Sequence, residues 1–257
     1  MSELKIGERE VVVPGQLLAV GMDFLPSHGT YRLGEQIIAN RLGVSVVEGK
    51  VIKTIPLAGV YLPKRNDIVI GRVLDILSMG WRVELKSPYT GLIPIKDGTF
   101  EFIPRGADLS RYYSIGEYFV GKITNVSGQN LIDVSVKGQG LHKLRGGRFV
   151  KVNTNKVPRI IGKKGSMVSM IKQATDCKIT VGQNGLIWLM GEPAMENLVV
   201  KTIKKIENES HISGLTNRIK EFLETATGKK LEAINEESGD NSNGSDDSNN
   251  QSKERDE

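Results

Sequence analysis

Short segments rich in Val, Ile and Leu, separated by turns that contain glycine, run through the first half of the chain. Such segments are typical of strands, and no helical period interrupts them. With 29 glycines in 257 residues, the pattern favours a mainly β protein over a bundle of long helices. Up to about residue 62 we expect a small all-β unit that serves as a scaffold or docking surface. Its strands are predicted at residues 10–14, 16–19, 36–40, 42–47 and 50–56.

A polar stretch at residues 62–67 separates this unit from a second series of β segments. Strands are predicted there at residues 68–77, 80–86, 90–95, 118–126 and 130–136. Five strands of this length with glycine at the bends fit the OB barrel, whose closure leaves few exposed edges. The segment 96–114 is too long for a hairpin loop, and loops of that size are usually functional or disordered.

From about residue 144 the pattern changes to a mixture of strands and helices, which indicates an α/β module. Ser166 is expected to cap its first long helix. One more helix is expected at 213–227, and the residues from 232 to 257 are expected to form a disordered acidic tail. The predicted order within the module is a strand at 149–153, a helical turn at 157–161, a helix from 166, strands at 177–181 and 186–190, and a helix at 194–208.

The net charge of +5 conceals two regions of opposite sign. Residues 231–257 hold nine acidic and two basic residues, a net of −7, which leaves 33 basic and 21 acidic residues, or +12, for residues 1–230. A basic excess of this kind attracts phosphate. No acidic residue occurs between Asp133 and Asp176, whereas ten basic residues do: Lys137, Lys143, Arg145, Arg148, Lys151, Lys156, Arg159, Lys163, Lys164 and Lys172.

The sequence lacks the patterns that are typical of enzymes and of cofactor or metal sites. It has neither a Gly-x-Ser-x-Gly element nor a phosphate loop ending in Gly-Lys-Ser/Thr. His28, His142 and His211 lie far apart and have no Cys or carboxylate at the spacing of metal ligands. We therefore expect no catalytic residue, metal or cofactor. The single Cys177 and the lack of a signal sequence or an apolar run of about 18 residues favour a soluble cytoplasmic protein.

The loop Gly162-Lys163-Lys164-Gly165 is the sharpest indication of a binding site. Its glycines let another backbone approach closely, the following helix offers its positive end, and the lysines add charge, so each part suits a phosphate. With Arg159-Ile160-Ile161 before it and a helix and hairpin after it, the passage resembles a type I KH domain. The resemblance implies that Arg159, Gly162, Lys163, Lys164 and Gly165 bind single-stranded RNA, with the loop clamping about four nucleotides.

The barrel segment resembles an S1 RNA-binding domain, through residues 71–76, 80–85, 91–94 and 116–123. Eight aromatic residues fall between positions 81 and 119, interleaved with basic residues. Bases stack on such rings at about 1–3 kcal/mol each, while Lys and Arg follow the backbone. We expect Trp81, Arg82, Arg105 and Arg111 to contact RNA. Where many S1 domains carry a His after the Gly-Leu-Ile element, this chain has Pro94, so individual base contacts do not transfer.

The order of the modules narrows the resemblance further. Polynucleotide phosphorylase has KH before S1, and the transcription elongation factor NusA has two KH units after S1, whereas this chain has a β unit, S1 and a single KH module. The chain therefore resembles the cap subunit of the archaeal exosome, the ribosomal RNA-processing protein four family. The motifs that carry this resemblance lie at residues 12–15, 28–31, 61–63, 67–73 and 184–188.

The resemblance implies a trimeric cap on a hexameric ring of phosphorolytic subunits, in which catalysis, phosphate and metal belong to the ring. The chain would then capture single-stranded RNA and feed 3′ ends to the ring for 3′-5′ degradation and processing. The expected domains are an N-terminal β docking domain at 1–62, the S1 domain at 63–143, the KH domain at 144–210, and a helical extension with the acidic tail at 211–257.

Two other functions remain open at this point. A free-standing regulator of transcription or translation would bind RNA through the same modules without a nuclease partner and would be a monomer. An autonomous ribonuclease would cleave RNA as an isolated chain, and the sequence offers no nucleophile, base or metal site for it.

Overall fold

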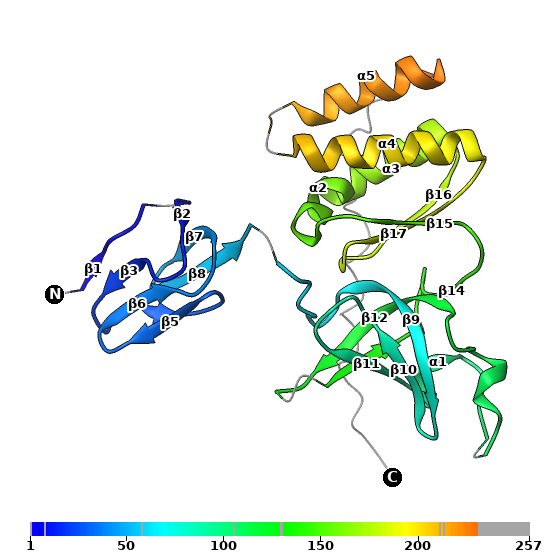
Figure 1. Cartoon of the computed structure of the whole chain (residues 1–257), viewed down its shortest axis with the longest axis horizontal. Coiled ribbons are helices and arrows are strands. Elements are labelled where there is room, and N and C mark those ends of the chain that lie inside the picture. Colours follow the sequence, from blue (N-terminus) through cyan, green and yellow to red (C-terminus); the bar gives the residue numbers. More distant parts are fainter. Residues whose placement is uncertain are drawn as a thin grey trace, which may run out of the picture.

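The computed structural model describes residues 2–7, 9–57, 59–104, 106–128, 131–210, 212 and 214–230. Figure 1 shows an N-terminal β domain to one side, a β-barrel, and an α/β domain stacked on the barrel. This arrangement confirms the mainly β, multidomain fold expected from the sequence. The predicted acidic tail lies outside the described residues. Within the described part of the chain, no helix is long and apolar enough to cross a membrane.

The N-terminal domain consists of two four-stranded sheets that share one small core. Every strand that we predicted in this region forms, and β1, β4 and β5 add to them. Val12, Leu18, Ile37 and Ile52 are fully buried and come from four different strands. One sheet has the order β1 (Glu3–Leu4), β3 (Leu17–Val20), β6 (Gln36–Ala39) and β5 (Thr30–Leu33); the other has β2 (Val11–Val12), β7 (Gly43–Glu48), β8 (Val51–Pro56) and β4 (Leu25–Pro26).

Five strands close the second domain into an OB barrel. Strand β9 pairs antiparallel with β10 and β12, and parallel pairing of β11 with β13 completes the closure. Phe119 is fully buried, and Gly71 and Gly121 make room for it, because a Cβ at either position would collide with its ring. The strands are β9 (Ile68–Leu77), β10 (Gly80–Glu84), β11 (Thr90–Pro94), β12 (Tyr118–Val126) and β13 (Ile132–Ser135), and the 96–114 segment begins in the short helix α1 (Ile95–Gly98).

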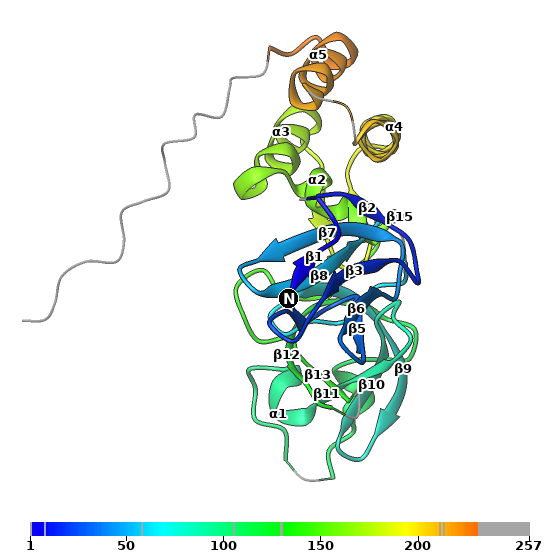
Figure 2. The same cartoon turned by 90° about the vertical axis from the view of Figure 1, so that its left-hand side faces the viewer.

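A sixth strand, β14 (Lys143–Leu144), pairs with β12 at the edge of the barrel sheet. We predicted a domain boundary between residues 143 and 144, and this position falls within β14. The domain limits remain a prediction. Residues 145–147 lead from β14 into the third domain, which Figure 2 shows above the barrel when the N-terminal domain faces the viewer.

The third domain follows the strand, helix, helix, strand, strand, helix order that defines a type I KH fold. Its antiparallel sheet has the order β15-β17-β16, with the helices packed against one face. Gly165, not Ser166 as we predicted, occupies the cap position of α3, because the left-handed backbone at Gly165 ends the loop and Ser166 already has helical angles. The elements are β15 (Arg148–Lys151), α2 (Val157–Ile161), α3 (Ser166–Thr175), β16 (Lys178–Val181), β17 (Leu186–Met190) and α4 (Pro193–Glu209).

A last helix, α5 (Leu215–Thr227), belongs to the same core. Leu215, Ile219 and Leu223 fall four residues apart, so they lie on one side of the helix, and all three are buried against α3 and α4. The helix that we expected at 213–227 is therefore present as α5, and this side of it packs into the KH core.

The KH domain is joined to the barrel by the side chain of Asn184, in the turn between β16 and β17. Its Nδ2 donates hydrogen bonds to Ile70 O at 2.7 Å and to Leu85 O at 2.9 Å, while Ile70 N donates to its Oδ1 at 3.3 Å. Next to it, Gln183 N donates to Ile68 O at 2.8 Å. Asn184 is only 3% exposed, so these bonds lie away from water.

An apolar cluster surrounds this contact. Ile70 and Val120 of the barrel share the cluster with Leu186 and Trp188 of β17, and Leu144 completes it. These residues lie on the face of the KH sheet opposite to the helices, so the sheet is covered on both sides in this region. The barrel and the KH domain therefore form one continuous body (Figure 1).

Asn184→Ala should lower the free energy of unfolding by about 2–4 kcal/mol, because three buried hydrogen bonds are lost and their backbone partners stay buried. Urea unfolding followed by tryptophan fluorescence measures this, since Trp188 lies in the same contact. Asn208→Ala, on the exposed surface of α4, is the matched control. Equal unfolding midpoints for the two variants would contradict the role given to Asn184.

Candidate nucleic-acid interface

The KH loop joins α2 to α3 through two glycines with different backbone conformations. Gly162 has φ 76° and ψ 175°, a region that is essentially restricted to glycine, and a Cβ there would lie 2.7 Å from Met167 N. Gly165 has φ 82° and ψ 8°, a left-handed conformation with open space around it. The first glycine therefore lets α3 begin close against the loop, and the second leaves bare backbone beside solvent.

The cations expected to bind phosphate lie around these glycines. Lys163 and Lys164 are exposed between them, and Arg159 is exposed on α2. Lys164 has φ 51°, which is uncommon for a residue with a side chain and is a form of local strain that occurs at ligand sites. The positive end of the ten-residue helix α3 follows directly. The structure thus brings all five predicted KH site residues together on one exposed loop and the helix before it.

The other basic residues between Asp133 and Asp176 have several different roles. Lys143 forms an ion pair with Glu117. Burial opposes ionisation of Glu117, but hydrogen bonds from Lys143 and from Ser114 N outweigh it and lower the pKa of that carboxyl. Lys156 Nζ donates to Ser210 Oγ at 2.6 Å, and Arg148 donates to Asn197 Oδ1 at 2.9 Å. The acid-free run is therefore not one phosphate-binding surface.

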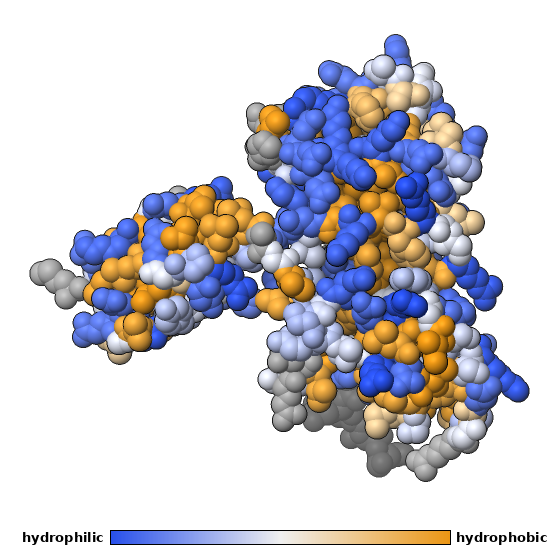
Figure 3. All heavy atoms as spheres, in the orientation of Figure 1, coloured by the Kyte–Doolittle hydropathy of each residue, from blue (hydrophilic) through white to orange (hydrophobic). Residues whose placement is uncertain are grey.

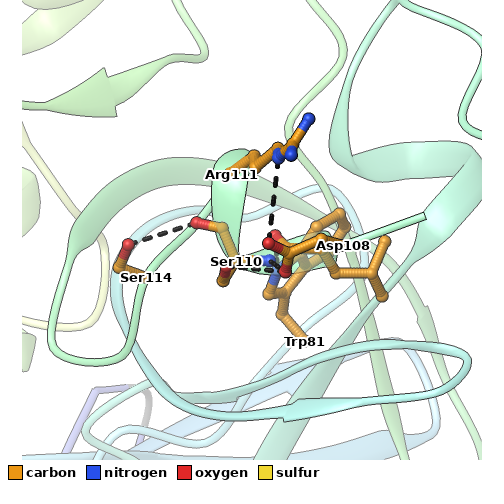
Figure 4. A network of polar contacts seen from close by, with 6 residues as sticks. Trp81, Asp108, Ser110, Arg111 and Ser114 are labelled. Atoms are coloured by element: carbon orange, nitrogen blue, oxygen red, sulfur yellow. Dashed lines mark hydrogen bonds and ion pairs between the residues drawn. The ribbon is translucent and has the colours of Figure 1, made fainter.

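In the barrel, the structure corrects the prediction for Trp81. Its side chain is 0% exposed, and Tyr113 packs edge-on against it at a centroid distance of 5.3 Å. Its Nε1 donates to Leu109 O at 3.2 Å. Figure 4 shows Trp81 together with Asp108 and Ser110 of the loop. The ring therefore has no face for a base to stack on. It instead fastens the 96–114 loop to the barrel, because Leu109 belongs to that loop and Gly98 packs against the same ring.

The three arginines predicted in the barrel have different surroundings. Arg82 lies on the outer face of β10 and forms an ion pair with Asp75 at 2.8 Å. Arg111 is 82% exposed, with its Nε 3.8 Å from Asp108 Oδ2 (Figure 4). The hydroxyl and N–H of Ser110, with a smaller effect of Arg111, hold the pKa of Asp108 below its usual value. Arg105 lies outside the described residues.

Exposed rings in the same loop are better placed to stack on bases than Trp81. Phe100 is 79% exposed and Phe102 is 89% exposed, and Tyr89 in the neighbouring turn is 38% exposed. Phe100 and Phe102 stand only two residues apart, and neighbouring exposed apolar side chains mark interaction sites. The prediction missed these phenylalanines because a loop without strand or helix period gives no signal of which side chains are buried.

Comparison with known proteins supports the KH assignment. A protein-family model described as KH domain matches residues 147–195. A solved crystal structure of a candidate exosome complex RNA-binding protein superposes with a TM-score of 0.58, at 34% identity, covering 65% of this chain and 97% of that one.

Similar curated proteins cover most of the chain. Its identity to the exosome complex component Rrp4 of Methanothermobacter thermautotrophicus is 40% over 235 residues, which are 91% of this chain and 74% of the relative. The component of the same name from Methanothermus fervidus is 40% identical over 86% of this chain and 97% of its own length. That from Pyrococcus furiosus is 40% identical over 87% of this chain and 86% of its own.

The two loop glycines should differ in their tolerance of a side chain. Gly162→Ala should cost about 3 kcal/mol of unfolding free energy, because it combines backbone strain with a clash, whereas Gly165→Ala should cost about 1 kcal/mol. Gly165→Asn should recover part of that cost, since Asn tolerates the left-handed region, and Gly162→Asn should recover nothing. Urea unfolding of the four variants checks the order, and equal costs at the two positions would contradict it.

Proposed function

The chain belongs to the Rrp4 family of exosome complex components, and from that premise we propose that it is a non-catalytic, RNA-binding cap subunit. In this role it captures single-stranded RNA and delivers 3′ ends to a phosphorolytic ring, which carries out 3′-5′ degradation and processing. We further propose that three copies form the cap on a hexameric ring in the cytoplasm. The observation that carries the proposal is the exposed KH loop, where cations and bare backbone meet.

The chemistry of the loop suits a nucleic-acid strand. Lys163, Lys164 and Arg159 offer positive charge, and the conformation of Gly165 leaves room for a sugar-phosphate backbone to approach. Phe100 and Phe102 offer flat faces to bases of any identity, and Arg111 adds charge beside them. Such contacts hold RNA without a strong sequence preference, as a subunit that feeds a nuclease requires.

A protein partner is supported by an apolar patch on the N-terminal domain. Val11, Val44 and Ile55 are cross-strand neighbours on β2, β7 and β8, and Val11 and Ile55 are 55% and 52% exposed. Figure 3 shows apolar side chains gathered on this domain near its connection to the rest of the molecule. Contiguous exposed apolar side chains mark interaction sites. The patch, called the docking patch below, consists of the exposed Val11, Val13, Leu42, Ile55 and Leu57 and the half-buried Val44 between them.

The docking patch favours a cap subunit over a free-standing RNA-binding regulator. A monomeric regulator has no use for five apolar side chains turned to solvent on a domain that carries neither the KH loop nor the barrel loop. We assign the patch to the ring.

Lys163→Asp combined with Lys164→Asp should weaken binding of a uridine oligomer while the fold stays intact. The slope of log K against log salt should become shallower by about 1.4, because two phosphate contacts to a single strand are lost. Fluorescence anisotropy at several salt concentrations measures both effects. Lys201→Asp with Lys204→Asp, on the exposed face of α4, makes the same change in charge away from the loop. An unchanged slope in the loop variant would refute the role of these lysines.

Val11→Asp combined with Val13→Asp should abolish capture of the chain by the purified ring, because charges enter an apolar contact, and should leave RNA binding unchanged. Size-exclusion chromatography of the mixture measures the capture. Ile115→Asp with Leu131→Asp alters exposed apolar residues of the barrel and serves as the control. Normal capture of the first variant would show that the docking patch has another partner.

A further inference from the structure

A cavity of about 870 Å³ lies where the N-terminal domain, the linker to the barrel and the KH domain meet. Arg41 and His28 of the N-terminal domain line one part of it, and residues 59–62 and 64 of the linker line another. Residues 154–158, 161 and 162 of the KH domain line a third. Pockets that hold small ligands usually measure about 300–1,000 Å³, so the cavity has room for a nucleotide.

The cavity adjoins the KH loop. Gly162, the first glycine of the loop, is among its lining residues, together with Pro158 and Ile161 of α2. Figure 1 shows the linker passing close to the end of the KH domain at which α2 lies. A strand of RNA held between Gly162 and Gly165 therefore has this cavity beside one end of its path.

The walls of the cavity are apolar, and its charged groups are mainly cationic. Val60 of the linker is 65% exposed and Leu62 is 36% exposed, and both line the cavity with Pro158. Such side chains suit the flat face of a base, which they partly remove from water. Arg41 and Lys64 supply positive charge in the same cavity.

The positive charge of these two residues is not neutralised within the described chain. Arg41 Nε donates to Asn40 Oδ1 at 2.9 Å, which is a neutral group, and no carboxylate of the described residues lies within ion-pair distance of Arg41 or Lys64. Among the described residues that line the cavity, Asp67 is the only acid, and it accepts a hydrogen bond from Tyr61 Oη at 2.7 Å. The cavity is therefore suited to an anion.

One lining residue also has an unused donor. Asn155 Nδ2 is buried and has no hydrogen-bond partner among the described residues. A buried donor without a partner is rare in folded proteins and calls for an explanation. Because this nitrogen is buried, an oxygen of a bound nucleotide reaches it only if the Asn155 side chain turns towards the cavity.

We propose that this cavity is a further RNA subsite, which seats a nucleotide next to those held by the KH loop. The base lies against Val60, Leu62 and Pro158, and Arg41 and Lys64 receive the adjoining phosphate. The inference rests on the proposed RNA-binding function. It adds that the linker and the N-terminal domain contribute to RNA binding, because half of the cavity belongs to them.

The test uses the full chain and fluorescent uridine oligomers from about four nucleotides, the length a KH loop holds, to about ten. Arg41→Glu combined with Lys64→Glu should bind the longest oligomer at least about tenfold more weakly, with a salt slope shallower by about 0.7 for the one phosphate lost, and the shortest oligomer as the wild type does. Val60→Trp, which fills the cavity without a change in charge, should also weaken only the longer oligomers. Lys201→Glu with Lys204→Glu is the control for charge.

Three outcomes would overturn the subsite. Both cavity variants could bind RNA like the control, or the charge variant could weaken the binding of all oligomer lengths equally. The charge variant could also fail to bind the ring while it binds RNA normally, which would make the cavity a protein contact. If Lys163→Asp with Lys164→Asp still weakens binding in the same assay, the failure concerns the subsite alone. If that variant also binds normally, the proposed function fails with it.

Discussion

The joint between the KH domain and the barrel rests on one buried amide, that of Asn184, and the rest of the RNA-facing architecture depends on it. The amide satisfies both backbone groups of Ile70 and the carbonyl of Leu85, which would otherwise be buried without partners. Apolar side chains around it exclude water, which strengthens those hydrogen bonds. The KH loop and the barrel loop that carries Phe100 are thereby held on a single body, so a bound strand meets both in a fixed relation.

The N-terminal domain is attached by other means. It continues through the linker to Tyr61, which is buried in the barrel core and donates its hydroxyl proton to Asp67. Burial, with that hydrogen bond, raises the pKa of Tyr61, so the donor stays protonated. The linker is thus anchored at its barrel end. Its residues Val60 and Lys64 line a cavity that is also lined by residues of the docking patch and of the KH loop. Ring binding and RNA binding would meet at this place.

The fold followed closely from local sequence patterns, whereas the site did so only in part. Strand alternation and glycine turns located the barrel and the KH elements, and the KH loop carried its own signal. The same alternation places Trp81 and Val83 inward and Arg82 outward. The sequence therefore did indicate that Trp81 is buried, and the prediction overlooked it. The exposure of Phe102 could not be predicted, because a loop has no periodic pattern of buried and exposed side chains. The contact of Asn184 could not be predicted either, since a turn of this composition has the same sequence pattern whether it faces water or a second domain.

The central claim is that this chain binds RNA for a nuclease and cleaves nothing itself. Degradation of a single-stranded RNA by the purified ring, with phosphate present, tests it most directly when run with the ring alone, the chain alone and both together. The account predicts that the chain alone leaves the RNA intact, and that adding it to the ring tightens RNA binding and makes degradation more processive. Shortening of the RNA by the chain alone, or a ring whose binding and processivity do not change, would contradict it.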